Sequence, residues 1–82
     1  MFPVNWKPLA VDGLAWVCVK HPDRWADIDV AEHDISYRLQ KDPRRYSHES
    51  SEGFRRIISS PLVVCFSIHE EVVYVEGVAW LE

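Results

Sequence analysis

Long apolar runs, cysteine clusters and glycine-rich loops are missing from this sequence. No stretch approaches the roughly 18 apolar residues of a membrane span, and no charged-then-apolar secretion signal opens the chain. The two cysteines, Cys18 and Cys65, lie in separate apolar runs, which is typical of small buried thiols rather than of a disulfide or metal motif. We therefore expect a reduced, cytoplasmic protein with no membrane partner.

The three glycines are isolated at positions 13, 53 and 77, so no phosphate-binding loop is present. The four histidines are scattered over all the predicted elements and form neither an HExxH motif nor a Cys/His cluster; they are His21, His33, His48 and His69. The sequence therefore predicts neither a metal site nor a cofactor.

What the chain does contain is apolar and aromatic side chains. Hydrophobic residues make up 48% of the 82 residues, and four of these are Trp, which is enough to build a core. A chain of this size can form only one such core. We expect a single folded domain over residues 1–82.

Charge is unevenly distributed along the chain. The net charge of −4 argues against broad, nonspecific affinity for nucleic acid, which depends on Lys and Arg. However, six of the nine basic residues lie between positions 38 and 56, beside only three acidic ones. This basic region predicts a recognition surface for an anionic ligand, with an ordinary solvated helix end and loop as the alternative.

Two helices are predicted in the first half. The first begins near Pro8 and ends near His21 and Pro22, with a gap in its pattern at Gly13. Its expected buried stripe is Val11, Leu14, Ala15 and Cys18. The second helix ends at Asp42 and Pro43. Its expected buried stripe is Trp25, Ile28, Ala31, Ile35 and Leu39.

Strands are predicted on both sides of these helices. Residues 2–6 form a short first strand, and residues 54–58, 62–68 and 72–81 form three strands rich in β-branched and aromatic residues. Short connections at 59–61 and 69–71 favour antiparallel hairpins, while the polar residues 47–53 predict a loop. The fold class is α+β: an N-terminal strand, then a two-helix hairpin packed on an antiparallel sheet with a C-terminal three-strand meander. Its expected core includes Leu39, Ile57, Val64, Phe66, Val75 and Val78.

The order of these elements and several local strings resemble the RelE/ParE superfamily, the toxin-like partners of type II toxin-antitoxin pairs. The string Pro-Leu-Val-Val-Cys-Phe-Ser-Ile at residues 61–68 is similar to the family's Pro-Leu-x-Val-x-Tyr-x-Val strand. Further matching strings lie at residues 39–43, 48–50, 53–57 and 75–80. These are framework features, so the resemblance implies a fold more than an activity.

The resemblance also implies where function would be expected. RNases of this family cut mRNA on the ribosome, assisted by basic side chains on the sheet and often by a Tyr or His near the C-terminus. In this sequence Val63 stands at a strand position where those RNases commonly carry Arg, and the chain ends in Trp80, Leu81 and Glu82. Neither Val nor an indole can stabilise a phosphorane or donate a catalytic proton. We therefore expect no ribosome-dependent RNase activity.

Weak catalytic candidates remain in the basic region. His48 could act as a general base oriented by Glu49, with Arg56 binding a phosphate, although a hydrogen-bonded loop is the simpler interpretation. Arg55 and Arg56 are adjacent in a strand, so they point to opposite faces and cannot form a clamp. Cys65 lies mid-strand, where burial raises a thiol pKa and argues against a nucleophile.

A partner-binding surface is the alternative to catalysis. The candidate partner-binding residues are Arg44, Arg45, Arg55, Arg56 and Trp16. Trp16 falls off the main stripe of the first helix and could anchor a partner helix or a second copy of the chain. The resemblance implies a cognate antitoxin as partner; a homodimer is possible, and contact with nucleic acid or the ribosome is weakly supported. Two other functions stay open, a catalytically silent binding module and a ParE-like gyrase poison.

Overall fold

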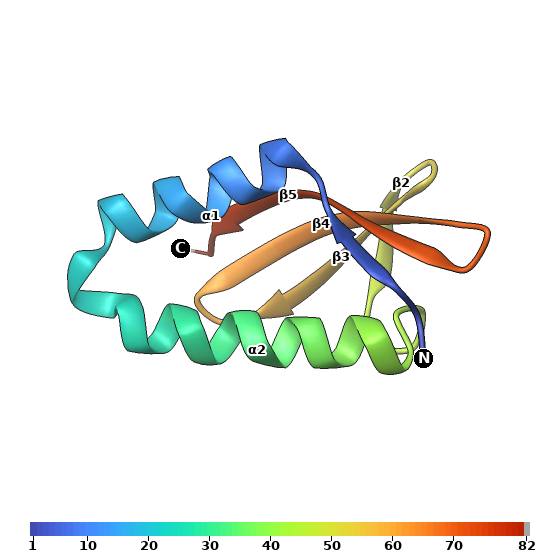
Figure 1. Ribbon diagram of the computed structural model, residues 1–82, viewed down its shortest axis with the longest axis horizontal. Helices are drawn as coiled ribbons and strands as arrows, with labels where there is room; N and C mark the ends of the chain where they lie inside the picture. Colours follow the sequence, from blue (N-terminus) through green and yellow to red (C-terminus); the bar gives the residue numbers. More distant parts are fainter. Residues whose placement is uncertain (82) are drawn as a thin grey trace.

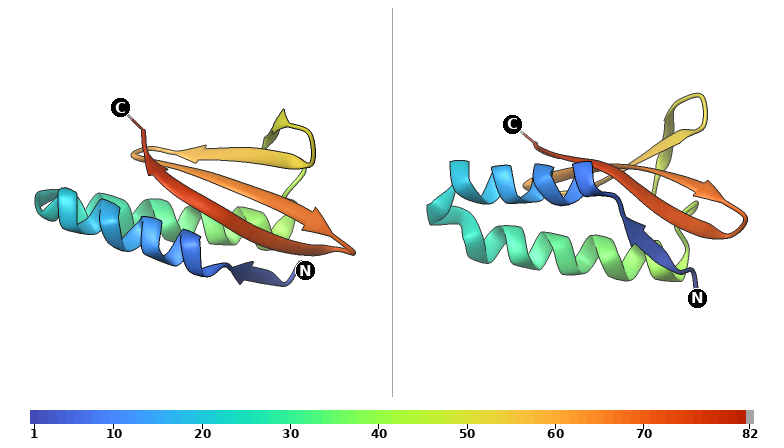
Figure 2. Two further views of the ribbon diagram at one scale, coloured as in Figure 1. Left: turned by 90° about the horizontal axis from the view of Figure 1, so that it is seen from above. Right: turned by 45° about the horizontal axis from the view of Figure 1, so that its top comes forward.

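The computed structural model describes residues 1–81 and consists of two helices packed on one face of a five-stranded sheet (Figures 1 and 2). Strand β1 (Val4–Trp6) is followed by helix α1 (Pro8–Lys20), a 3-10 turn η1 (Pro22–Arg24) and helix α2 (Trp25–Lys41). Strands β2 (His48–Ser51), β3 (Phe54–Ser59), β4 (Leu62–His69) and β5 (Val72–Trp80) complete the chain. The predicted α+β architecture is confirmed. No helix in the described part of the chain is long and apolar enough to cross a membrane.

The sheet has the strand order β1-β5-β4-β3-β2. Strands β2 to β5 form an antiparallel meander, but β1 pairs with β5 in parallel, with Val4 opposite Val73 and Trp6 opposite Val75. The sheet is therefore mixed rather than wholly antiparallel, because the N-terminal segment joins the free edge of β5 in the same direction.

The segment predicted as a loop at 47–53 contains strand β2. Its four residues are polar and exposed, so no apolar alternation marks them as a strand. They are held instead by backbone pairing with β3, in which His48 lies opposite Arg56 and Glu49 opposite Arg55. An edge strand of this kind is specified by its neighbour rather than by its own composition.

The core lies between the helices and the inner face of the sheet. Five of the six residues expected there are fully buried, namely Leu39, Ile57, Val64, Phe66 and Val75, while Val78 packs partly buried against them. Four residues of the predicted α2 stripe are also buried: Ile28, Ala31, Ile35 and Leu39.

Two details of the predicted helix stripes are wrong. Trp25, at the start of α2, is exposed, and its indole N–H donates a 2.7 Å hydrogen bond to the carbonyl of Cys18. In α1 the buried residues are Ala10 and Val17, whereas Val11 and Ala15 are exposed. Helix α1 is apolar around nearly its whole circumference, so periodicity alone does not select the face that meets the sheet.

Gly13 lies at a close approach of α1 to β5. A Cβ atom built at Gly13 would lie 2.9 Å from the backbone oxygen of Val78. Only a residue without a side chain allows this spacing, so the glycine that weakens the helical pattern in the sequence is needed for helix-to-sheet packing.

Candidate functional site

The two helices cover one face of the sheet and leave its outer face uncovered (Figure 2). A row of cross-strand neighbours runs over it from β2 to β5: His48 lies opposite Arg56, Arg56 opposite Cys65, and Cys65 opposite Gly77. Directly opposed residues share a face of the sheet. The register therefore gathers three polar side chains that are far apart in sequence.

The weak catalytic candidates are only partly brought together. His48 and Arg56 share the outer face, but Glu49 lies opposite Arg55 and points the other way. Within residues 1–81, no hydrogen bond links the side chains of His48 and Glu49. The carboxylate that was expected to orient the imidazole is thus on the wrong face, and no acid-base pair forms here.

Next to this row, the outer face is apolar. Val63 lies between Ile58 and Ala79 in the register, so the position that the family's RNases commonly fill with Arg has apolar neighbours on both sides. The side chains of Val63, Ile58 and Ala79 themselves carry no group that could stabilise negative charge developing on a phosphate.

Glu76 is the acidic group of the outer face, and it is already engaged. Its carboxylate accepts a 3.0 Å hydrogen bond from the hydroxyl of Ser67 and lies 3.2 Å from the ammonium of Lys7. The Lys7 ammonium also lies 5.6 Å from the centre of the Tyr74 ring. These contacts hold Glu76 in place at the β-bulge of β5, where the register shifts opposite Cys65 and Phe66.

Cys65 is a poor nucleophile. Partial burial raises the pKa of its thiol, the negative charge of Glu76 raises it further, and Arg56 acts in the opposite direction. The thiolate, which is the reactive form, is therefore scarce at neutral pH. The direction of the pKa shift is the one expected from its mid-strand position.

The basic region does not form one continuous surface. Arg55 points to the inner side of β3, where its guanidinium donates hydrogen bonds to the hydroxyl and carbonyl of Ser47 and to the carbonyl of Arg44. These hydrogen bonds tie the partly buried Arg55 to the loop before β2. Within residues 1–81, neither Arg55 nor Arg56 forms an ion pair with Glu49, Glu52 or Glu76.

The remaining arginines of this region differ in their partners. Arg38 lies 3.1 Å from Asp34, and Arg44 lies 3.5 Å from Glu71. Arg45 contacts the Tyr46 ring, and Arg56 stands exposed on the outer face. Neither Arg45 nor Arg56 forms an ion pair within the described residues.

The two tryptophans singled out in the sequence have different environments. Trp16 is 62% exposed, as expected for a side chain off the buried stripe. Trp80 pairs with the buried Leu62 and faces the helices, where its ring stacks on His21 at 3.6 Å. Trp80 and Val63 therefore lie on opposite faces of the sheet, so the Trp80 side chain does not contribute to the outer face. Glu82 lies outside the described residues.

A shallow apolar groove of about 260 Å³ lies between the helices. Its lining is Leu14, Cys18, Trp25, Ile28, Asp29 and Glu32. The two carboxylates stand at its α2 side, so the groove combines an apolar floor with an acidic border. It is a surface suited to protein contacts rather than to chemistry.

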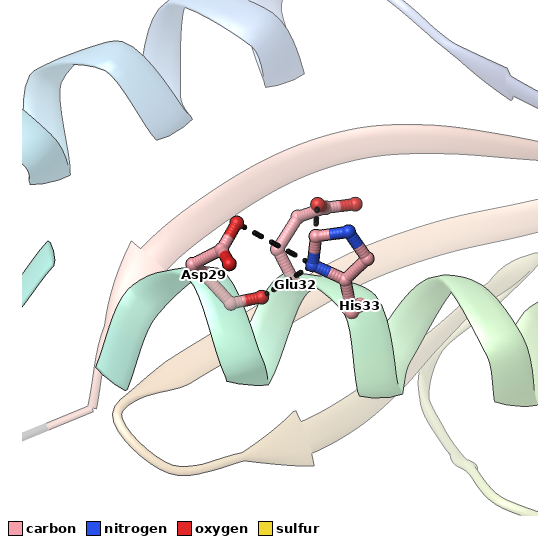
Figure 3. A group of neighbouring side chains, drawn as sticks. All are labelled: Asp29, Glu32 and His33. Carbon is pink, nitrogen blue, oxygen red and sulfur yellow. Dashed lines mark hydrogen bonds and ion pairs between the residues drawn. The ribbon is translucent and has the colours of Figure 1, made fainter. Parts of the chain in front are cut away.

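Asp29, Glu32 and His33 form a cluster on α2 (Figure 3). The sequence pattern, in which the four histidines are scattered, did not predict this cluster. Their ligand atoms lie within 4.8 Å of one another, as the helical spacings of three and four residues allow. However, His33 Nδ1 contacts the carbonyl of Asp29 at 2.8 Å, and His33 is well exposed. These contacts raise the pKa of His33, first through the carbonyl and then through the two carboxylates.

Two solved structures share this fold over their whole length. A chain from the "Chromosomal ParDE TA system from P. aeruginosa" superposes with a TM-score of 0.79 at 13% identity, covering 100% of this chain and 98% of that one. A chain from the toxin-antitoxin complex RelBE2 of Mycobacterium tuberculosis superposes with a TM-score of 0.75 at 17% identity, covering 96% of each. No protein-family model and no curated protein sequence matches. The chain therefore shares its fold with these two chains from toxin-antitoxin systems.

Proposed function

We propose that this chain is the toxin-like component of a type II toxin-antitoxin module, that it binds an antitoxin protein in the cytoplasm, and that it has no ribosome-dependent RNase activity. The observation that carries the first part is the match over the whole length of both chains to proteins solved within toxin-antitoxin systems.

The outer face of the sheet supports the absence of RNase chemistry. Val63 is flanked by Ile58 and Ala79, burial and Glu76 raise the pKa of the Cys65 thiol, and Glu76 is engaged by Ser67 and Lys7. General acid-base catalysis needs a titratable group whose pKa lies near the working pH and which can reach the substrate. His48 lies on this face, but Glu49 lies opposite Arg55 and faces the other way, and the carboxylate of Glu76 is engaged by Ser67 and Lys7.

The interhelical groove and the exposed Trp25 support protein binding as the mode of action. An apolar floor with a tryptophan at its border fits the anchor residues that dominate protein interfaces. The same observations favour a second candidate, a catalytically silent binding module on this scaffold. A ParE-like gyrase poison is the third reading that the experiment must separate.

The test is induction of the chain in a bacterial host, alone and together with the short open reading frame next to its gene. Growth arrest that the neighbouring product relieves is the expected result. Absence of arrest with a stable complex between the two products would favour the silent module. Purified protein added to a coupled translation reaction should leave mRNA intact, and codon-specific cleavage would contradict the proposal. Inhibition of purified gyrase in a supercoiling assay would identify the gyrase poison.

A further inference from the structure

Helix α1 presents an apolar face to solvent. Its inner side packs on the sheet through Ala10 and Val17, yet on the opposite side Leu9, Trp16 and Val19 are 77%, 62% and 70% exposed. Single exposed apolar residues are normal on protein surfaces. Several exposed apolar residues on one face of one helix, however, form a patch of the kind that marks a contact surface. A helix that is apolar all round is usually covered on both sides.

The exposed face has a regular spacing. Leu9, Asp12, Trp16 and Val19 follow one another at intervals of three, four and three residues, the spacing of a helix-to-helix seam. Asp12 and Lys20 are the two charged residues of α1, and they lie four residues before and four residues after Trp16. Asp12, Trp16 and Lys20 thus form one ridge along the helix, with an acid at one end, an indole in the middle and a base at the other end.

This ridge is complementary to itself. If two such helices cross antiparallel about a two-fold axis at Trp16, Asp12 of each copy meets Lys20 of the other. In a parallel arrangement, like charges would meet. Neither Asp12 nor Lys20 forms an ion pair elsewhere in residues 1–81, and the Lys20 ammonium lies 4.7 Å from the centre of the Trp16 ring.

We propose that the outer face of α1 is a homodimer contact, in which α1 packs antiparallel against α1 of a second copy of this chain. The interface is isologous, since the same ridge serves both subunits. It lies on a different side of the molecule from the outer face of the sheet, so the proposal does not depend on the toxin-like function. Dimerisation would leave the row of His48, Arg56 and Cys65 uncovered.

The size of the contact sets its strength. A helix of 13 residues is about 20 Å long, and one face of it offers less than the roughly 800 Å² per partner of a standard interface. We therefore expect a weak dimer, with a dissociation constant in the micromolar range.

The test is sedimentation equilibrium of the purified chain over a wide concentration range. The wild type should change from monomer to dimer. Val19→Glu should weaken association at least tenfold, whereas Val30→Glu should not, because Val30 is equally exposed (69%) but lies on α2. Circular dichroism verifies that each variant is folded.

Charge exchange tests the antiparallel arrangement. Asp12→Lys and Lys20→Glu should each weaken the dimer, since each places two like pairs across the interface, and the double variant should restore it. A monomer at every concentration, or a dimer indifferent to Val19→Glu, overturns the proposal. If each single variant weakens the dimer and the double variant does not restore it, the antiparallel register is wrong. A monomeric wild type whose complex with the adjacent gene's product is weakened by Val19→Glu would assign the face to a heterologous partner.

Discussion

At the scale of single residues, two adjacent arginines of one strand have different roles. Arg55 holds Ser47 and Arg44 through hydrogen bonds on the inner side of β3, and Arg56 stands exposed next to Cys65 on the outer side. Charge alone would place both in one binding surface. Strand alternation separates them, so Arg55 is hydrogen-bonded to the loop before β2, while Arg56 is exposed on the outer face.

The reactivity of Cys65 provides a residue-scale prediction. In a Cys18→Ser background, Glu76→Gln should accelerate alkylation of Cys65 by iodoacetamide at pH 8, because removing the carboxylate lowers the thiol pKa. Arg56→Gln should slow alkylation, because the guanidinium stabilises the thiolate. The two rates are compared with the parent by mass spectrometry. Changes in the same direction for both variants would mean that exposure, and not charge, controls the thiol.

His33 makes stability depend on pH. Its folded-state pKa is raised above the ordinary value of 6.5 by the Asp29 carbonyl and by the carboxylates of Asp29 and Glu32. The folded state therefore binds the proton more tightly than the unfolded state, and this contribution is fully present below pH 6.5 and lost as the pH rises through the raised pKa. His33→Gln should lower the urea midpoint at pH 5.5 more than at pH 8.5. An equal effect at both pH values would show that the ion pairs are too solvated to matter.

At the scale of elements, the contact of α1 with β5 depends on Gly13. Gly13→Ala should improve helix propensity by about 1 kcal/mol, but the new methyl group would meet the Val78 backbone oxygen at 2.9 Å, and overpacking of this kind costs about 1–3 kcal/mol. We expect a net loss of stability in urea unfolding. Gly77→Ala is the control, since nothing lies within 4 Å of a Cβ atom there. A Gly13→Ala variant more stable than wild type would show that α1 can move off the sheet.

The turn between β4 and β5 is a second element-scale case. Glu70 and Glu71 both have positive φ, 51° and 65°, a conformation that costs an ordinary residue about 1–2 kcal/mol and favours Asn and Gly. Replacement by Asn-Gly should raise the free energy of unfolding by about 1 kcal/mol, even after loss of the exposed Arg44–Glu71 pair. Gly53→Glu in the β2–β3 turn, where φ is 80°, should lower the free energy of unfolding. An unchanged urea midpoint for the Asn-Gly variant would show that the positive φ angles of Glu70 and Glu71 do not destabilise the protein.

At the scale of the whole molecule, positive charge is concentrated on a chain that is otherwise acidic, but its arginines are divided among several surroundings. Arg56→Gln should weaken binding to an acidic antitoxin about tenfold at low salt and less at high salt. Lys7→Gln changes the charge by the same amount on the same face, but Lys7 already pairs with Glu76. It should therefore have a smaller effect. Calorimetry at two salt concentrations measures both, and equal losses would leave the surface without a defined recognition site.

The sequence by itself determined the elements that carry strong periodicity. The α2 stripe from Ile28 to Leu39 and the apolar strands β3, β4 and β5 were predicted correctly, because each buries a face that its own residues define. The two short hairpin connections were sufficient to predict the meander. The resemblance in the strings at 39–43 and 61–68 led to the fold that the solved structures share.

Tertiary structure decided what local pattern leaves open. The polar strand β2 exists because β3 offers it backbone partners, and β1 runs parallel to β5 because that edge was free. Helix α1, apolar on nearly all sides, is oriented by the close approach at Gly13 and not by its periodicity. The row of His48, Arg56 and Cys65 likewise arises from the register between strands. Such pairings join residues distant in the chain, so their energies are fixed only once the whole sheet has formed.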